Sequence, residues 1–201
     1  MANNPLSELN ILYVEDERII RDEFVEILEE EVNAFFVANN GQEGLTLFEE
    51  HEIDIVITDI RMPVMDGLDM SRDILQINPN MPIIISSAFN DTDYLMESIK
   101  LGMHYYLLKP INLQELFATL EKISINVLNA KRLKRSEKLL SQYKEAVDKN
   151  AIVSKADKNG IISYANDSFS KISGYTKDEL IGNSHNIVRH PDTSDEFFKD
   201  L

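Results

Sequence analysis

The sequence predicts an α/β protein: a doubly wound sheet of five parallel strands, followed by a long helix and a smaller, partial α+β segment. Over roughly the first 125 residues, short apolar runs alternate five times with helical patterns. The third run, Ile53–Asp59, is rich in β-branched residues, which is typical of a strand buried on both faces of a parallel sheet. After Asn112 no Gly or Pro occurs as far as Asn150, which favours one continuous helix.

The elements follow one another in a regular order. The predicted strands are residues 9–14, 34–38, 53–59, 81–87 and 104–108. The predicted helices cover about 19–28, 41–51, 68–78, 92–101 and the segment from 112 onward. Gly102 reads as the C-cap of the fourth helix, because glycine adopts the left-handed conformation that ends many helices.

Composition excludes several classes of protein. The formal net charge of −15 argues against a nucleic-acid-binding surface in this chain, since phosphate contacts need clustered Lys and Arg. The absence of cysteine excludes disulfides and thiolate metal sites, and it fits a cytoplasmic location. No apolar run approaches the roughly 20 residues that a membrane span needs. We therefore expect a soluble protein or a soluble fragment.

Polar side chains stand where four of the predicted strands end. Glu15 and Asp16 follow the first strand, Asp59 ends the third, Ser87 ends the fourth and Lys109 follows the fifth. The carboxyl ends of parallel strands open into one crevice, which is where ligands bind in open α/β sheets. Taken singly, Asp59 fits a helix-capping aspartate and Lys109 fits a surface lysine. The combination at successive strand ends favours a functional site.

Three carboxylates brought together repel one another unless a cation joins them. Oxygen ligands of this kind suit Mg²⁺, which binds one or two carboxylates together with phosphate oxygens. A lysine and a hydroxyl opposite the metal complete a clamp for a phosphoryl group. Asp59 is then a candidate nucleophile, because carboxylates form acyl phosphates.

Residues 9 to about 125 resemble a response-regulator receiver domain of the chemotaxis type. The matching motifs are Glu15-Asp16, Asp59 with Met62-Pro63 and Asp66-Gly67, Ser87-Ala88, and Lys109-Pro110. The resemblance implies a flavodoxin-like sheet with strand order 2-1-3-4-5. It also implies a phosphoacceptor switch rather than an enzyme, whose partner is a histidine kinase.

The resemblance assigns roles to individual residues. Asp59 would accept phosphate from a kinase phosphohistidine. Mg²⁺ would be held by Asp16, Asp59, the backbone carbonyl of Arg61 and, through water, Glu15. Ser87 and Lys109 would hold the phosphoryl oxygens. The aromatic switch position falls on Tyr106, for which a half-buried strand residue with a surface hydroxyl is the structural alternative.

Two further positions of the resemblance concern the lifetime of the phosphate. They fall on Arg61 and Phe89. A bulky Phe89 would hinder the attacking water and Arg61 would contact the phosphoryl group, so we expect slow autodephosphorylation. In the switch itself, the added charge would reposition the loops after the fourth and fifth strands and change the face built by the fourth helix, fifth strand and fifth helix.

The last helix extends beyond the receiver-like region. We expect a receiver domain over 1–125 and a helical, coiled-coil linker over 126–149 that pairs with a second copy of the chain. Apolar residues continue at three-and-four spacing with one phase slip near Ala130–Leu133, so two helices with a bend are the alternative. The basic run Lys131–Arg135 reads as a solvated face, with an anion-binding patch as the alternative.

Residues 150–201 resemble the N-terminal half of a PAS domain of the aerotaxis-receptor type. Short strands at 151–155 and 161–164 flank the turn Asp157–Gly160, and the run His185–Asp192 follows. In flavin-binding members of that group the matching positions are associated with FAD; here they are Asn166, His185, Arg189, His190 and Asp192. A haem or other metal, and a purely structural role for Asn166 and His185, stay open.

A PAS sheet needs further strands, so we expect a longer signalling protein whose output module lies outside this sequence. Two other functions compete with the phosphorylated switch. A scaffold that dimerises without phosphate is one. A Mg²⁺-dependent phosphohydrolase is the other, and it is disfavoured because Arg61 stands two residues after Asp59, where a second acid/base carboxylate would be needed.

Overall fold

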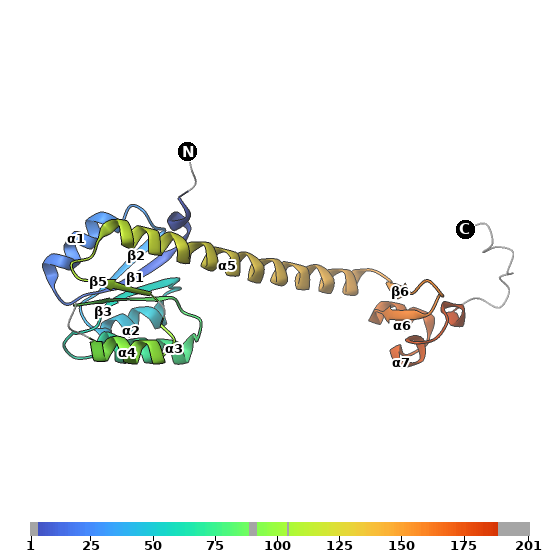
Figure 1. Cartoon of the computed structure of the whole chain (residues 1–201). Coiled ribbons are helices and arrows are strands. Elements are labelled where there is room, and N and C mark those ends of the chain that lie inside the picture. Colours follow the sequence, from blue (N-terminus) through green and yellow to red (C-terminus); the bar gives the residue numbers. More distant parts are fainter. Residues whose placement is uncertain (1–3, 89–91, 104, 189–201) are drawn as a thin grey trace. The chain divides into compact units, whose positions relative to one another are not determined.

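The computed structural model describes residues 4–88, 92–103 and 105–188, and the side chains of 92–95 lie outside the description (Figure 1). The chain divides into two compact units, Met1–Arg132 and Leu133–Leu201. The boundary falls inside a helix, so the linker expected at 126–149 is shared between the units, and the three-part division stays a prediction.

The first unit is built on a five-stranded parallel sheet. Its strands are β1 (Asn10–Val14), β2 (Ala34–Ala38), β3 (Ile55–Asp59), β4 (Ile83–Ser87) and β5 (Tyr105–Leu108). The strand order is β2-β1-β3-β4-β5, which confirms the predicted fold class. β4 begins two residues later than predicted, immediately after Pro82, which has no N–H to donate to the ladder.

Helices cover both faces of this sheet (Figure 1). On one face lie α1 (Arg18–Leu28) and the first part of α5 (Leu113–Asn150); on the other lie α2 (Gly41–Glu50), α3 (Gly67–Ile77) and α4 (Thr92–Lys100). A short 3-10 helix, η1 (Pro5–Glu8), precedes β1. As predicted, Gly102 ends α4 with a positive φ of 82°.

Two apolar cores lie between the sheet and its helices, because neighbouring side chains of a strand point to opposite faces. Tyr13 and Ile57 pack with Phe24 and Leu116 under α1 and α5. Leu12 and other inward residues of the strands pack under α2 and α3. β3 is buried along its whole length, as its β-branched composition predicts. Both cores fix the position of Asp59 at the end of that strand.

α5 is one helix from Leu113 to Asn150, rather than two helices separated by a bend. Two cations of its basic run are paired within the first unit. Lys131 Nζ donates to both carboxylate oxygens of Asp54, at 3.0 and 2.8 Å, and Arg132 Nη2 lies 3.8 Å from Glu8 Oε1. Part of the basic run therefore forms ion pairs within the first unit, which neither of the two interpretations of the sequence anticipated.

The described part of the second unit contains an antiparallel hairpin of β6 (Ser154–Ala156) and β7 (Ile162–Ala165). The predicted turn is present: Gly160 has a φ of 76° and its N–H donates to the carbonyl of Asp157. The unit continues with α6 (Asp167–Ser173), α7 (Lys177–Leu180) and a 3-10 helix, η2 (His185–Val188). Among the described residues of both units, no helix is long and apolar enough to cross a membrane.

Candidate functional site

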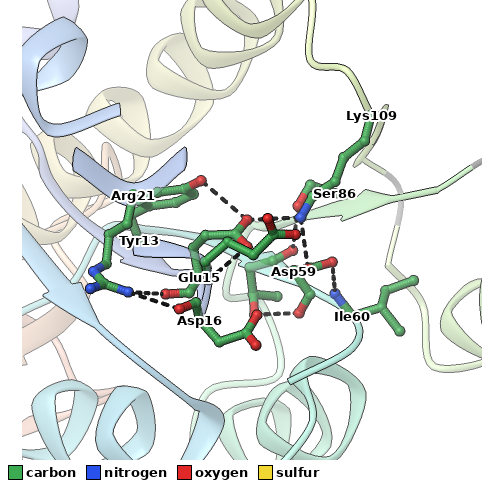
Figure 2. Close-up of polar contacts among 10 residues, drawn as sticks. Tyr13, Glu15, Asp16, Arg21, Asp59, Ile60, Ser86 and Lys109 are labelled. Carbon is green, nitrogen blue, oxygen red and sulfur yellow. Dashed lines mark hydrogen bonds and ion pairs between the residues drawn. The ribbon is translucent and has the colours of Figure 1, made fainter. Parts of the chain in front are cut away.

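The carboxyl ends of the strands bring the predicted polar residues into one crevice (Figure 2). β1 and β3 are adjacent, so Glu15 and Asp16 follow Val14 beside the strand that ends in Asp59. β5 is two positions further along the sheet, and Lys109 reaches back from its end. The sheet order, with β1 and β3 at its centre, is what brings these distant residues together.

Lys109 joins two of the carboxylates. Its Nζ donates to Asp59 Oδ2 at 2.7 Å and to Glu15 Oε2 at 2.9 Å. The Glu15 side chain is fully buried, and the side chains of Asp59 and Lys109 are 11% and 19% exposed. Burial of an ion pair carries a desolvation cost that offsets the attraction between its charges, but removing one partner leaves the other as an uncompensated buried charge, which is strongly destabilising.

The pKa values of two groups reflect this arrangement. Burial raises the pKa of Glu15 above its usual value, the bond from Lys109 partly offsets that effect, and the neighbouring charge of Asp59 adds to it. Burial works against the charged form of Lys109, but its bonds to Asp59 and Glu15 prevail and raise its pKa. Lys109 therefore favours the ionised form of Glu15 against the effect of its burial.

The same crevice fits a divalent cation. One carboxylate oxygen from each of Glu15, Asp16 and Asp59 lies within 4.8 Å of the others, with Asp16 exposed to solvent. Three hard oxygen donors with an open side toward water are the donor set that Mg²⁺ takes when it also binds a phosphate. This set matches the residues that the sequence singled out as metal ligands.

The end of β3 holds Asp59 in a fixed orientation. Asp59 Oδ1 accepts from the backbone N–H of Ile60 at 2.7 Å, and its carbonyl oxygen accepts from Thr58 Oγ1 at 2.9 Å. Gly67 packs directly against this turn: a Cβ at Gly67 would lie 1.9 Å from the carbonyl oxygen of Asp59. A glycine is therefore required at the start of α3, and the Asp66-Gly67 motif has a steric cause.

Two residues missed in the sequence support the acidic pair. Arg21, on α1, donates from Nη1 to the backbone carbonyls of Glu15 at 2.8 Å and Asp16 at 3.2 Å. Tyr13, on β1, is fully buried, and its hydroxyl donates to Glu15 Oε2 at 3.4 Å. The sequence signal for Tyr13 is its place two residues before Glu15, since side chains two apart point to the same side of a strand.

The structure places the hydroxyl-bearing residues at the end of β4. Ser87 is 3% exposed, and its backbone carbonyl accepts from the N–H of Lys109 at 2.8 Å. Ser86, which the sequence did not single out, pairs with Asp59 in the ladder, and its hydroxyl donates to the carbonyl of Thr58 at 3.3 Å. The role of Ser87 as a phosphoryl ligand stays a prediction.

Three other predicted residues have different outcomes. Tyr106 is half-buried on β5 and its hydroxyl bonds to the carbonyl of Met103, so its switching role stays a prediction. Arg61 is exposed in the loop after β3, and the role of its carbonyl as a metal ligand also stays a prediction. Phe89 lies outside the described residues.

In the second unit, Asn166 has the structural role that the sequence left as an alternative. Its Oδ1 accepts from the N–H groups of Val153 and Phe169, at 3.0 and 2.9 Å, which caps α6. Its Nδ2 donates to the carbonyls of Ala151 at 2.6 Å and Asp148 at 3.3 Å. This buried amide thus uses both donors and both acceptor positions within the unit, and none remains for a flavin.

The other flavin positions gain no support. His185 Nε2 lies 2.9 Å from Ser154 Oγ, and the imidazole lies against the ring of Phe169, with centroids 5.7 Å apart. Arg189, His190 and Asp192 lie outside the described residues. Within the described part of the unit, no arrangement of side chains supports the FAD expectation, which we do not carry forward.

Comparison with known families agrees with this geometry. Residues 11–121 match the response regulator receiver domain, and the chain belongs to that family. Residues 150–201 match the PAS fold. The chain is thus a two-component response-regulator receiver joined by α5 to PAS sequence, and both resemblances drawn from the sequence are confirmed.

Two curated proteins are similar to this chain in sequence. It is 36% identical over 141 residues to the Bacillus subtilis uncharacterised transcriptional regulatory protein YesN, and 34% identical over 116 residues to the Staphylococcus aureus transcriptional regulatory protein HptR. These matches cover 69% and 56% of this chain but 38% and 45% of the relatives, so the chain spans less than half the length of either.

Solved structures show the same fold. The N-terminal domain of an uncharacterised protein from Wolinella succinogenes is 37% identical, with a TM-score of 0.58, over 61% of this chain and 98% of that domain. A receiver domain from Clostridium thermocellum is 35% identical, with a TM-score of 0.55, over 62% of this chain and 98% of that domain. These neighbours correspond to the first unit.

Proposed function

We propose that the chain is a phosphorylation-controlled switch in which Asp59 accepts a phosphoryl group from the phosphohistidine of a partner histidine kinase. The observation that carries this proposal is the contact of Asp59 with Lys109 at 2.7 Å, beside the carboxylates of Glu15 and Asp16. A nucleophile, a metal-binding set and a cation for the phosphoryl oxygens meet in one crevice.

In the transfer, a carboxylate oxygen of Asp59 forms a bond to phosphorus while the bond from phosphorus to the histidine nitrogen breaks. The nitrogen keeps the electron pair. Asp16, Asp59, the Arg61 carbonyl and, through water, Glu15 would hold Mg²⁺, which neutralises charge on the phosphoryl oxygens. Lys109 exchanges its bonds to Asp59 and Glu15 for one to a phosphoryl oxygen, and the Ser87 hydroxyl donates to another.

The phosphoryl group adds nearly two negative charges at neutral pH. Lys109 and Ser87 are joined through their backbones, so movement of either side chain toward the phosphate affects the ends of β4 and β5 together. We propose that this shifts Tyr106 and changes the face formed by α4, β5 and α5. The signal then passes along α5 to the PAS segment and to an output module outside this sequence.

The first test is the intact mass of the protein after incubation with acetyl phosphate and Mg²⁺, beside Asp59→Asn as the matched control. We expect one phosphoryl adduct on the parent, none on the variant, and loss of labelling when EDTA removes the metal. No adduct on the parent, under conditions that label a known receiver, would favour the phosphate-independent scaffold. Steady turnover of a small phosphate ester would instead favour the phosphohydrolase.

We further propose that α5 pairs with α5 of a second copy. Every residue from Leu133 to Val147 is exposed, so this part of α5 has no tertiary packing within the described part of the chain. Most helical stability in proteins comes from packing an apolar face, which a second copy could supply. Leu133, Leu140 and Val147 recur every seven residues, and Tyr143 lies three residues after Leu140. This is the spacing of a coiled-coil seam.

The charges beside this seam favour a parallel arrangement. In a parallel pair, Arg132 of one copy faces Glu137 of the other, five residues further on, so opposite charges meet. Sedimentation velocity tests the pairing with Leu140→Lys, which places a charge in the seam. Gln142→Lys is the matched control, because it adds the same charge away from the seam. We expect only Leu140→Lys to shift the protein toward monomer. Equal sedimentation coefficients of both variants and the parent would refute pairing of α5 through these residues.

A further inference from the structure

Tyr13 lies in the apolar core yet points its hydroxyl at the functional site (Figure 2). The residue is fully buried, and its ring stacks on Phe24 with centroids 4.7 Å apart and on Phe35 at 6.2 Å. The hydroxyl donates to Glu15 Oε2. A buried hydroxyl needs a hydrogen-bond partner, and here that partner belongs to the proposed metal site.

We propose that Tyr13 is a positioning residue of the acidic site, whose hydroxyl holds Glu15 in place when a metal ion or a phosphoryl group displaces Lys109 from that carboxylate. The inference rests on the proposed function. Glu15 Oε2 accepts from Lys109 at 2.9 Å and from Tyr13 at 3.4 Å, so both donors share one oxygen. Once Lys109 moves, Tyr13 is the donor that stays.

The surroundings make Tyr13 suited to this task. The Tyr13 ring stacks on the rings of Phe24 and Phe35, and this packing restrains the hydroxyl independently of Lys109. A tyrosine hydroxyl is protonated at neutral pH, so Tyr13 can act as a donor to this carboxylate. The other carboxylate oxygen, Oε1, accepts from the backbone N–H of Glu17, also at 3.4 Å.

The variant Tyr13→Phe removes the hydroxyl and keeps the ring that packs on Phe24 and Phe35. We measure its Mg²⁺ dissociation constant by calorimetry, with no phosphodonor present, and the Mg²⁺ concentration that gives half-maximal labelling by acetyl phosphate. Groups that orient a metal ligand typically change metal affinity by about 10-fold or more when removed. We expect a weakening of about 10-fold in both quantities, with the labelling rate at saturating Mg²⁺ unchanged.

A double-mutant cycle separates positioning from a loss of core packing. If Tyr13 acts through Glu15, then Tyr13→Phe changes Mg²⁺ affinity in the parent but not in a Glu15→Gln background. The matched control is Tyr105→Phe, which removes a hydroxyl from a tyrosine packed against the same core. We expect this control to leave the Mg²⁺ affinity unchanged.

Equal Mg²⁺ affinities of the parent and Tyr13→Phe would overturn the inference, as would equal losses in the parent and Glu15→Gln backgrounds. The calorimetry distinguishes this failure from failure of the proposed function. If Asp59 is labelled but Tyr13→Phe binds Mg²⁺ normally, only the role of Tyr13 is refuted. If the parent binds Mg²⁺ but is never labelled, the proposed function fails, while the calorimetric cycle still decides whether Tyr13 positions Glu15 for the metal.

Discussion

The ammonium group of Lys109 lies 2.7 Å from Oδ2 of Asp59, so the side chain that follows β5 neutralises the one that ends β3. The same ammonium also reaches buried Glu15 at 2.9 Å. One cation thus compensates two carboxylates that share a site. A metal ion or a phosphoryl group entering the crevice competes directly with these contacts, and this competition links ligand binding to the stability of the first unit.

Replacing Lys109 with alanine should destabilise the metal-free protein. Buried Glu15 would lose its counter-charge, and breaking a shielded ion pair costs about 3 kcal/mol. Urea denaturation measures the free energy of unfolding, and Mg²⁺ should recover more of it in Lys109→Ala than in the parent. Lys122→Ala removes an exposed lysine of α5 as the control. Equal stability of Lys109→Ala and the parent would show that the pair is not stabilising.

The raised pKa of Glu15 predicts a pH-dependent difference between the parent and Glu15→Gln without metal. The folded protein binds the Glu15 proton more tightly than the unfolded chain does, so the ionised group costs stability above its folded-state pKa. That cost disappears as the pH falls through the folded-state pKa toward about 4.5, the ordinary value.

Urea denaturation of both proteins between pH 8 and pH 4.5 measures this difference. Glu26→Gln, at an exposed position of α1, is the matched control, because it makes the same substitution at a carboxylate that is not buried. The stability of the parent relative to Glu15→Gln should increase as the pH falls. A flat or decreasing difference would contradict the assigned direction.

Gly67→Ala should disturb the turn that carries Asp59. The new Cβ would lie 1.9 Å from the Asp59 carbonyl oxygen, so the backbone must shift, at a cost of about 2–4 kcal/mol in the free energy of unfolding. Gly102→Ala is the comparison: its positive φ costs about 1 kcal/mol, but its Cβ meets nothing within 4 Å. A smaller loss for Gly67→Ala than for Gly102→Ala would argue against the close approach.

Asn166→Ala should loosen the junction between the end of α5 and β7. The variant leaves the N–H groups of Val153 and Phe169 without their bonds and removes the cap of α6, which costs the second unit about 2 kcal/mol or more. Hydrogen exchange should accelerate at residues 151–170 and stay unchanged in the sheet of the first unit. Asn159→Ala, in the exposed hairpin turn, is the control. Equal exchange rates in both variants would refute a stabilising role of Asn166 at this junction.

Much of the first unit could be predicted because its signals are local. The β-branched residues of β3 indicate a buried strand. Gly102 indicates the end of α4, because glycine readily adopts the left-handed conformation found there. The residues at the strand ends could also be grouped, because a parallel sheet places all its carboxyl ends at one edge. The resemblance to receiver domains added roles to these positions, and family membership is confirmed while the individual roles stay predictions.

Individual side-chain contacts that do not follow from the strand order could not be predicted. Nothing local to Lys131 indicates that its ammonium will meet Asp54, 77 residues earlier, and the basic run was accordingly interpreted as a solvated face. The flavin expectation gained no support for a similar reason. Which groups Asn166 bonds depends on how α5 and β7 approach one another, and the structure gives its amide entirely to that junction.

By itself the sequence determined the order of strands and helices, the acidic and basic residues at the strand ends, and the long helix that leaves the receiver, because each depends on periodicity and chain connectivity. Only the tertiary structure decided that Lys109 bridges Glu15 and Asp59, that Tyr13 reaches Glu15 from the core, and that Gly67 must lack a side chain. Those relationships depend on distances of a few ångströms between segments whose separation in the sequence carries no such information.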